Sequence, residues 1–194
     1  MTYTSTFSLW GIFLIWRAEM FARYAHWSVG HKRKYTNQPY STHLAEVALT
    51  VARTSNPSYE QIAVAWLHDT LEDVPWVSER LLRFLFGDIV TVGVIALTDV
   101  YTNRTYAGVN REERKRREAY RLGGIYRDWQ TVKYADLISN ASTIIALNTG
   151  FSRIYLKEIQ AMLTKMQDGD PALRRHCQAL VELGVIYLNG KEIQ

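Results

Sequence analysis

Apolar residues recur at helical spacing along most of this chain, and this spacing limits the fold more than any other feature. One set at positions i, i+3, i+4 and i+7 consists of Leu44, Val47, Ala48 and Val51. Residues with this spacing lie on one face of a helix. The alternation that is typical of strands is nowhere sustained. We therefore predict an all-α fold, arranged as a helical bundle.

Capping signals and helix-breaking residues give the expected helix boundaries. Ser58 and Gln61 form a capping-box signature, and Asn110 with Glu113 can cap another helix. The predicted helices lie at about residues 9–27, 44–55, 58–68, 78–87, 88–97 and 110–123, with further helices starting near 128 and 171. No repeat, low-complexity tract or Pro/Gly/Ser-rich linker divides the 194 residues, so we predict a single domain over residues 1–194.

The segment from Phe7 to Trp16 holds eight apolar residues in ten. It is shorter than the roughly 20 residues that span a bilayer. Neither a preceding basic residue nor a clear small-residue cleavage site marks it as a signal peptide. We predict a buried first helix and no membrane partner. An interfacial contact or a contact between copies of the chain is the alternative, so a homo-oligomer stays open.

Charge and cysteine content exclude several classes of protein. The net charge of +4 is mildly basic, which argues against a dedicated nucleic-acid packing protein, and no nucleic-acid partner is expected. Residues 111–127 hold seven Lys or Arg against three Glu. The favoured interpretation is a solvated helix, and the alternative is a cationic rim that attracts a polyphosphate. The single cysteine, Cys177, excludes a disulfide framework and fits a reducing, cytoplasmic location.

The strongest local feature is the segment HDTLED at residues 68–73, which combines one imidazole with three carboxylates. It directly follows an apolar helix, where the burial of unpaired carboxylates would be costly. A divalent cation removes this cost, because it turns clustered anions into ligands. The segment therefore indicates a metal site.

Two further segments could complete this site. His43 opens the helix of residues 44–55. Asp136, Asn140 and Thr143 stand at i, i+4 and i+7, so they form one polar stripe on an otherwise apolar helix. Two histidines and two aspartates would give a mixed nitrogen and oxygen ligand set. This set suits Mn, Fe, Co or Zn, and ligand chemistry alone does not choose among them.

The order of these motifs resembles a known family. H…HD…D, with HDxxED as its second element, looks like the HD-domain metal-dependent phosphohydrolases. Over roughly residues 18–150, four segments are similar to the hydrolase domain of the RelA/SpoT alarmone enzymes: GHKRK…PYSTH, AWLHDTLEDV, FGDIV and TVKYADLISNAST. The chain departs from the usual pattern at Leu44, where the family has Pro, and at Tyr134, where Leu is common. No departure removes a presumed ligand.

The resemblance implies a role for each matching residue. The ligands of one divalent metal, typically Mn²⁺, would be His43, His68, Asp69 and Asp136. The acid/base pair would be Glu72 and Asp73. The nucleotide substrate would be contacted by Arg33, Lys34, Asn140 and Thr143. Structural roles are the alternatives: a helix-capping or core histidine, a solvated basic loop and buried hydrogen bonds. Two more histidines, His26 and His31, lie near the nucleotide loop and stay outside the metal set, since four ligands are already supplied.

The implied activity is metal-dependent hydrolysis of the 3′-pyrophosphate of ppGpp or pppGpp, which would yield GDP or GTP and pyrophosphate. We expect a stand-alone small alarmone hydrolase, because 194 residues are too few to include the synthetase and regulatory domains of the long bifunctional enzymes. Two alternatives stay open. One is an HD hydrolase for another nucleotide, such as ppApp, a dNTP, a nucleoside monophosphate or NADPH. The other is a non-catalytic nucleotide-binding or antitoxin module.

Overall fold

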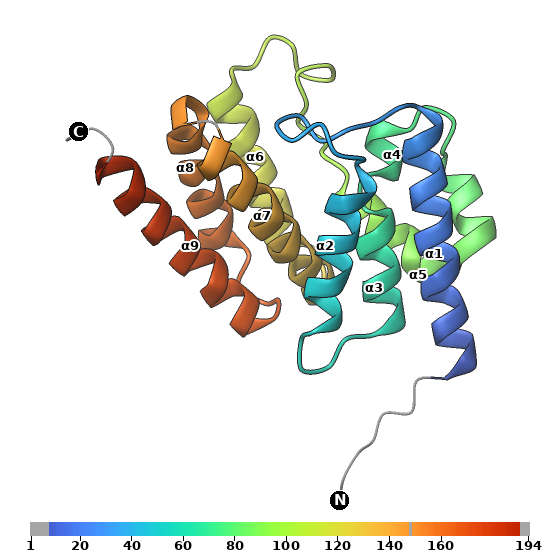
Figure 1. Cartoon of the computed structure of the whole chain (residues 1–194). Coiled ribbons are helices and arrows are strands. Elements are labelled where there is room, and N and C mark those ends of the chain that lie inside the picture. The colour runs from blue at the N-terminus through green and yellow to red at the C-terminus, as the bar shows by residue number, and fades with distance from the viewer. Residues whose placement is uncertain (1–7, 148, 191–194) are drawn as a thin grey trace, which may run out of the picture.

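The computed structural model describes residues 8–147 and 149–190, and the regular elements in these ranges are helices, with one isolated β-bridge between Lys32 and Pro39. The predicted all-α fold is confirmed (Figure 1). In chain order the helices are α1 (Leu9–Ser28), α2 (Ser41–Ala52), α3 (Tyr59–Leu67), α4 (Thr70–Asp73), α5 (Glu79–Leu97), α6 (Arg111–Gly123), α7 (Arg127–Leu147), α8 (Thr149–Lys165) and α9 (Pro171–Gly190).

The predicted helix starts carry the expected caps. The Ser58 side chain accepts from the Gln61 backbone, and the Gln61 side chain accepts from the Ser58 N–H, which completes the capping box at α3. The Asn110 side chain accepts from the Glu113 N–H at α6. The expected break at Gly87 lies inside α5, where this residue has φ 80° and ψ 177°. Glycine reaches this conformation easily because it has no Cβ.

Two hydrophobic clusters form the interior. The first is built mainly from α1, α2, α3 and α5, and the second from α6, α7, α8 and α9. Helix α7 contributes to both: Val132 and Ala135 pack in the first cluster, whereas Leu137 and Ala141 pack in the second. In Figure 1, α7 accordingly lies between α2 on one side and α8 and α9 on the other.

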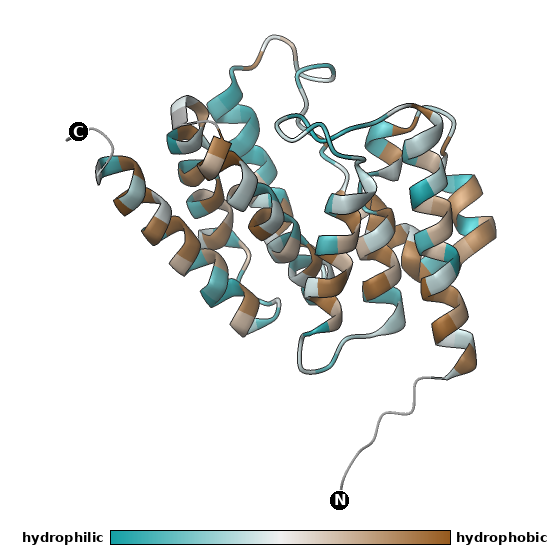
Figure 2. Ribbon diagram, in the orientation of Figure 1, coloured by the Kyte–Doolittle hydropathy of each residue, from teal (hydrophilic) through white to brown (hydrophobic). Residues whose placement is uncertain are grey.

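The prediction of a buried first helix is wrong for one face of α1. Small residues such as Ala18 and Ala22 are fully buried, whereas Leu9 and Trp10 are 88% and 66% exposed. The face that packs in the interior carries mostly small side chains together with Leu14, and most of the bulky residues lie on the opposite face. The N-terminal half of α1 is largely brown in Figure 2. Phe7 lies outside the described residues. The alternative of an interfacial or dimer contact stays a prediction. No helix among the described residues is long and apolar enough to cross a membrane.

Candidate metal centre and substrate pocket

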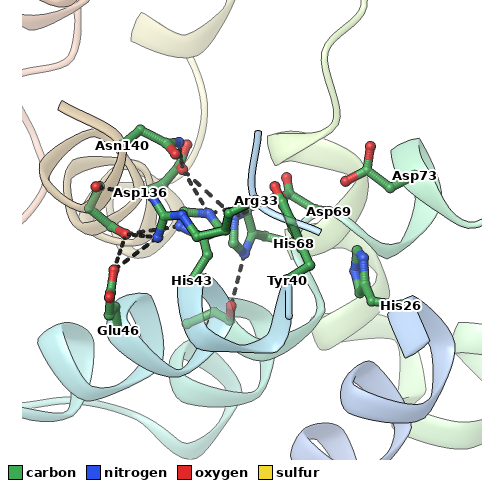
Figure 3. Close-up of polar contacts among 12 residues, drawn as sticks. His26, Arg33, Tyr40, His43, Glu46, His68, Asp69, Asp73, Asp136 and Asn140 are labelled. Atoms are coloured by element: carbon green, nitrogen blue, oxygen red, sulfur yellow. Dashed lines mark hydrogen bonds and ion pairs between the residues drawn. The ribbon is translucent and has the colours of Figure 1, made fainter. Parts of the chain in front are cut away.

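Three neighbouring helices bring the four predicted metal ligands together (Figure 3). His43 lies in the first turn of α2, and Asp136 lies in the middle of α7. His68 and Asp69 occupy the break between α3 and α4, where the chain changes direction. The adjacent side chains of His68 and Asp69 could not share one face of a straight helix, but at this break both can point toward His43.

The ligand atoms of these residues lie close to one another. His43 Nε2 is 3.3 Å from Asp136 Oδ1 and 3.6 Å from Asp69 Oδ2. His68 Nε2 is 3.0 Å from Asp69 Oδ2 and 3.8 Å from Asp136 Oδ1. Atoms that share one ion through bonds of about 2.1 Å are separated by roughly 3.0 to 3.4 Å. Two of the four separations fall in this range, and the other two are slightly longer. One ligand atom each of His43, His68 and Asp69 lies within 4.8 Å of the others, so these three residues could hold one metal ion, and Asp136 lies beside them through its contacts with both histidines.

Hydrogen bonds fix the tautomer of both imidazoles. His68 Nδ1 lies 2.8 Å from the Ala65 carbonyl, which can only accept, so Nδ1 carries the proton. His43 Nδ1 lies 2.9 Å from the Ser139 hydroxyl, which donates its own proton to Glu46 and therefore accepts from His43. Each neutral ring thus presents the lone pair of Nε2 to the two carboxylates. Both Nε2 atoms are buried and have no hydrogen-bond partner among the described residues.

The electrostatics of this cluster call for a positive charge. Burial lowers the pKa of His68, but the carboxylates of Asp69 and Asp136 outweigh it and raise this pKa to about 10. Burial raises the pKa of Asp136, yet Lys133 and the two histidines bring it well below its usual range. Either protonated imidazoles or a metal ion can supply the charge. The donor set, the distances and the orphaned nitrogen atoms all fit a divalent transition metal.

Several residues that the sequence analysis missed hold the ligands in place. Lys133 Nζ lies 2.8 Å from Asp136 Oδ2. The Tyr40 hydroxyl donates to Asp69 Oδ2 at 2.6 Å. Ser139 and Glu46 orient His43. Helical spacing could have found three of them, because Lys133 and Ser139 stand three residues from Asp136, and Glu46 stands three residues from His43.

The predicted acid/base pair lies on α4, one turn beyond Asp69. Glu72 Oε2 accepts from the backbone N–H of Asp99 at 3.2 Å. Burial and the negative charges of Asp99 and Asp69 raise the pKa of Glu72. Burial and the charges of Asp69 and Glu72 raise the pKa of Asp73 to about 7. A carboxyl with this pKa can both hold and release a proton near neutral pH, as a general acid or base must.

The predicted substrate residues line one cavity of about 210 Å³ beside the metal ligands, namely Arg33, Lys34, Asn140 and Thr143. Arg33 is buried, and its guanidinium donates to Glu46 Oε2 at 3.0 Å and to Thr143 Oγ1 at 3.1 Å. Asn140 Nδ2 donates to Asp136 Oδ1 at 2.6 Å, so this residue links the cavity to the metal cluster. Lys34 is exposed, and its ammonium lies 5.4 Å from the centre of the Tyr35 ring.

Most of the basic residues of α6 are paired. Arg111 bonds to Glu158, Lys115 bonds to Asp99, and both Arg116 and Arg117 bond to Glu113. These contacts favour the interpretation of this stretch as a solvated helix whose charges are largely paired. They leave less charge for attraction of a polyphosphate.

Comparison with solved structures finds the same fold elsewhere. A solved structure described as a metazoan ortholog of SpoT that hydrolyses ppGpp and plays a role in starvation responses superposes with a TM-score of 0.76. The sequences are 19% identical, and the match covers 94% of this chain and 98% of the other. A protein from Listeria monocytogenes EGD-e, solved at 1.85 Å, matches with a TM-score of 0.61 and 22% identity, over 77% of this chain and 98% of its own. At these identities the likeness extends to the fold.

No curated protein sequence matches the chain. The family profile described as HD domain matches residues 18–149, which agrees with the range of about 18–150 expected from the motifs. This range contains every residue of the metal cluster, the acid/base pair and the cavity. Because the match extends over well more than half of the chain, the protein belongs to the HD-domain family.

Proposed function

We propose that the protein is a metal-dependent phosphohydrolase that removes the 3′-pyrophosphate of ppGpp or pppGpp, with GDP or GTP and pyrophosphate as products. The observation that carries this proposal is the pair of buried Nε2 atoms of His43 and His68, which make no hydrogen bond among the described residues and lie 3.3 Å and 3.0 Å from the carboxylates of Asp136 and Asp69. The carboxyl groups of Glu72 and Asp73 and a cavity of about 210 Å³ adjoin this cluster. The hydrolysis of ppGpp by the metazoan structural relative supports the choice of substrate.

A divalent ion, with Mn²⁺ as the expected one, would be held by His43, His68, Asp69 and Asp136 and would supply Lewis-acid activation of water and of a phosphoryl oxygen. The protein contributes rigidity to this site. His43 is fixed through Ser139, and His68 is fixed through the Ala65 carbonyl. Ligands held in this way are preorganised for one ion, since their ring orientation and tautomer are set before binding.

Proton transfer belongs to Glu72 and Asp73 in this proposal. In the reaction an oxygen of water bonds to the phosphorus next to the 3′ oxygen of the ribose, and the bond between that phosphorus and the 3′ oxygen breaks. One carboxylate accepts a proton from the water, and the carboxyl form of the other donates a proton to the ribose oxygen. The raised pKa of Asp73, about 7, keeps a protonated fraction available at neutral pH.

Substrate binding is assigned to the cavity of Arg33, Lys34, Asn140 and Thr143. The fixed guanidinium of Arg33 offers a planar cation to a base or a phosphate, and Lys34 adds a mobile charge.

We further propose that the described helices form one domain, because α7 is shared by both hydrophobic clusters. We also propose that the protein acts in the cytoplasm, where a single buried cysteine stays reduced.

The test is incubation of metal-stripped protein with ppGpp, with and without added Mn²⁺, while GDP and pyrophosphate are followed by chromatography. We expect both products to form only with the metal, and Asp69→Ala to abolish their release. Retention of ppGpp together with cleavage of ppApp, a dNTP, a nucleoside monophosphate or NADPH would refute the proposed substrate. Tight nucleotide binding without any turnover would refute the enzymatic function.

A further inference from the structure

A second cluster of possible metal ligands lies beside the first. His26 comes from the last turns of α1, His31 from the loop that follows, and Asp73 from the end of α4. One ligand atom from each lies within 4.8 Å of the others. His26 Nδ1 is 3.0 Å from His31 Nδ1, and His31 Nδ1 is 3.5 Å from Asp73 Oδ2. Figure 3 shows Asp73 and His26 together on the far side of Asp69 from His43.

Hydrogen bonding within this cluster leaves the partly exposed Asp73 carboxylate without a close partner among the described residues. Two neutral imidazoles whose Nδ1 atoms face each other can share one proton, so one Nδ1 donates and the other accepts. That proton is then engaged between the rings, and the Asp73 oxygen at 3.5 Å is beyond the length of a charge-assisted hydrogen bond. A cation between the three atoms would satisfy all of them at once. Two nitrogens and one carboxylate oxygen form the set that Zn²⁺ and Fe²⁺ use in proteins.

Tyr40 holds both histidine rings in position. Its ring stacks on His31 with a centroid distance of 3.8 Å and on His26 with 4.8 Å. Its hydroxyl donates to Asp69 of the first cluster. The backbone adds to this order, because His31 N–H donates to the His26 carbonyl at 3.0 Å. These contacts hold the two imidazole rings beside each other.

An ion could reach this cluster from solvent. His26, His31 and Tyr40 line a cavity of about 570 Å³, together with Tyr24 and Trp27. His26 is itself buried, while the side chains of His31 and Asp73 are 28% and 29% exposed. The partly exposed ligands give an entry path, and the remaining coordination positions would be open to water.

We propose that His26, His31 and Asp73 bind a second divalent transition-metal ion next to the one assigned to the first cluster. The proposal does not depend on the nucleotide that the protein cleaves. An ion at this cluster would bind Asp73 as a carboxylate, so the donation of a proton to the ribose oxygen would then fall to Glu72. It accounts for four of the five histidines of the chain, since two serve each cluster. The fifth, His176, lies on α9 outside both and provides a matched control.

The experiment is equilibrium dialysis of the full chain against Zn²⁺, with bound metal measured by mass spectrometry, and repeated with Co²⁺ to record ligand-field absorption. We expect two ions per chain in the parent protein and in His176→Phe. His31→Phe keeps a ring to stack on Tyr40 but removes the ligand, so it should bind one ion. Asp73→Asn, which nearly preserves the size of the side chain, should also bind one, and so should Asp69→Ala through the second cluster.

Binding of a single ion by the parent protein would overturn the proposal, provided that Asp69→Ala loses this ion. Equal metal content in the parent, His31→Phe and Asp73→Asn would overturn it as well, because the extra ion would then lie elsewhere. Circular dichroism of each variant shows whether the helices are retained. The number of metal ions bound per chain does not depend on whether the protein cleaves ppGpp. The second metal site and the proposed enzymatic function can therefore be refuted separately.

Discussion

Ser139 positions His43, one of the four candidate metal ligands, without being one of them. Its hydroxyl accepts from His43 and donates to Glu46, which sets the tautomer of His43. Replacement by Ala leaves the His43 Nδ1 proton without this acceptor, so the ring is free to turn or to change tautomer. We expect Ser139→Ala to weaken metal binding by about 10- to 100-fold, as is usual for partners of ligating histidines.

Titration of the metal-stripped protein with Mn²⁺ or Co²⁺ measures this change. Ser142→Ala is the matched control, because Ser142 is exposed on the same helix and bonds only to a backbone carbonyl in the structure. Equal metal affinity in Ser139→Ala and in the parent would show that Ser139 does not position the ligand.

Arg33 should affect substrate binding more than metal binding. Its guanidinium reaches Thr143 in the cavity and is anchored by Glu46. We expect Arg33→Gln to raise KM for ppGpp by about 10-fold or more, since loss of a charge-assisted contact costs about 1.5 to 3 kcal/mol, with a smaller increase for the exposed Lys34→Ala. Steady-state kinetics and metal analysis separate the effects. A loss of metal with unchanged KM would contradict this role.

Cys177 should be inert in the folded protein. Burial raises the pKa of its thiol from 9.0 to about 12, and Sγ lies 3.3 Å from the Tyr134 carbonyl. The folded state therefore keeps this proton between about pH 9 and 12, where the unfolded state loses it, so the contribution to stability falls as pH rises through this window. We expect a thiol reagent at pH 8 to label the protein only after denaturation. Rapid labelling of the native protein would disprove the burial.

At the residue scale, the sequence motifs, together with the family resemblance, predict the two histidines and two aspartates that lie near one another in the first cluster of candidate metal ligands. They cannot predict that Asp73 lies close to His31, because α1, the following loop and α4 meet only in the tertiary fold. For the same reason the motifs alone do not identify His26 and His31 as possible ligands. Helical spacing also does not predict that the Tyr40 hydroxyl donates to Asp69, because the two residues are 29 positions apart in the sequence.

At the scale of elements, the buried Glu118 ties α6 to the loop after α5. Its carboxylate accepts from the backbone N–H groups of Val100 and Tyr101, and it pairs with Arg121. Arg121 also donates to the Ala96 and Thr98 carbonyls near the end of α5. Glu118 is therefore the centre of a network that holds this loop beside the acid/base pair.

We expect Glu118→Ala to lower the free energy of unfolding by about 3 to 5 kcal/mol, because the change leaves a partly buried arginine without its partner. Urea denaturation followed by circular dichroism measures the loss. Glu112→Ala, an exposed change on the same helix, should alter stability by less than about 0.5 kcal/mol. Similar values for the two variants would show that the network contributes little.

Helices that begin with a side-chain capping residue are the easiest to predict from the sequence. Ser58 and Asn110 cap their helices as expected, because side-chain capping depends on residues close in sequence. The burial of α1 is not predictable from its apolar content. A helix that is apolar on most sides has no periodic contrast to show which face is covered, and here mostly small residues face the interior, together with Leu14.

At the scale of the whole molecule, the four candidate metal ligands connect three parts of the fold, because they come from α2, from the α3–α4 break and from α7. An ion that binds only the folded state stabilises it by about 2.7 kcal/mol when its concentration is 100 times Kd. For a chain of this size, we expect a rise in Tm of about 5 to 11 °C on addition of Mn²⁺ to metal-stripped protein. Differential scanning calorimetry measures this rise, and Asp69→Ala should lose most of it. An unchanged Tm in the parent would argue against a metal bound by these residues.

The shared position of α7 has a consequence for how the protein opens. Val132 and Leu137 of α7 lie in the two different hydrophobic clusters. Separation of either hydrophobic cluster from α7 would therefore expose apolar side chains of the helix on which the other cluster also packs. The backbone amides of α7 should therefore be among the last to exchange with deuterium, while those at the outer ends of α1 and α9 exchange early. The helix that supplies Asp136 would then be among the parts of the molecule that open least often, so the candidate metal ligand would keep its place while neighbouring helices open locally.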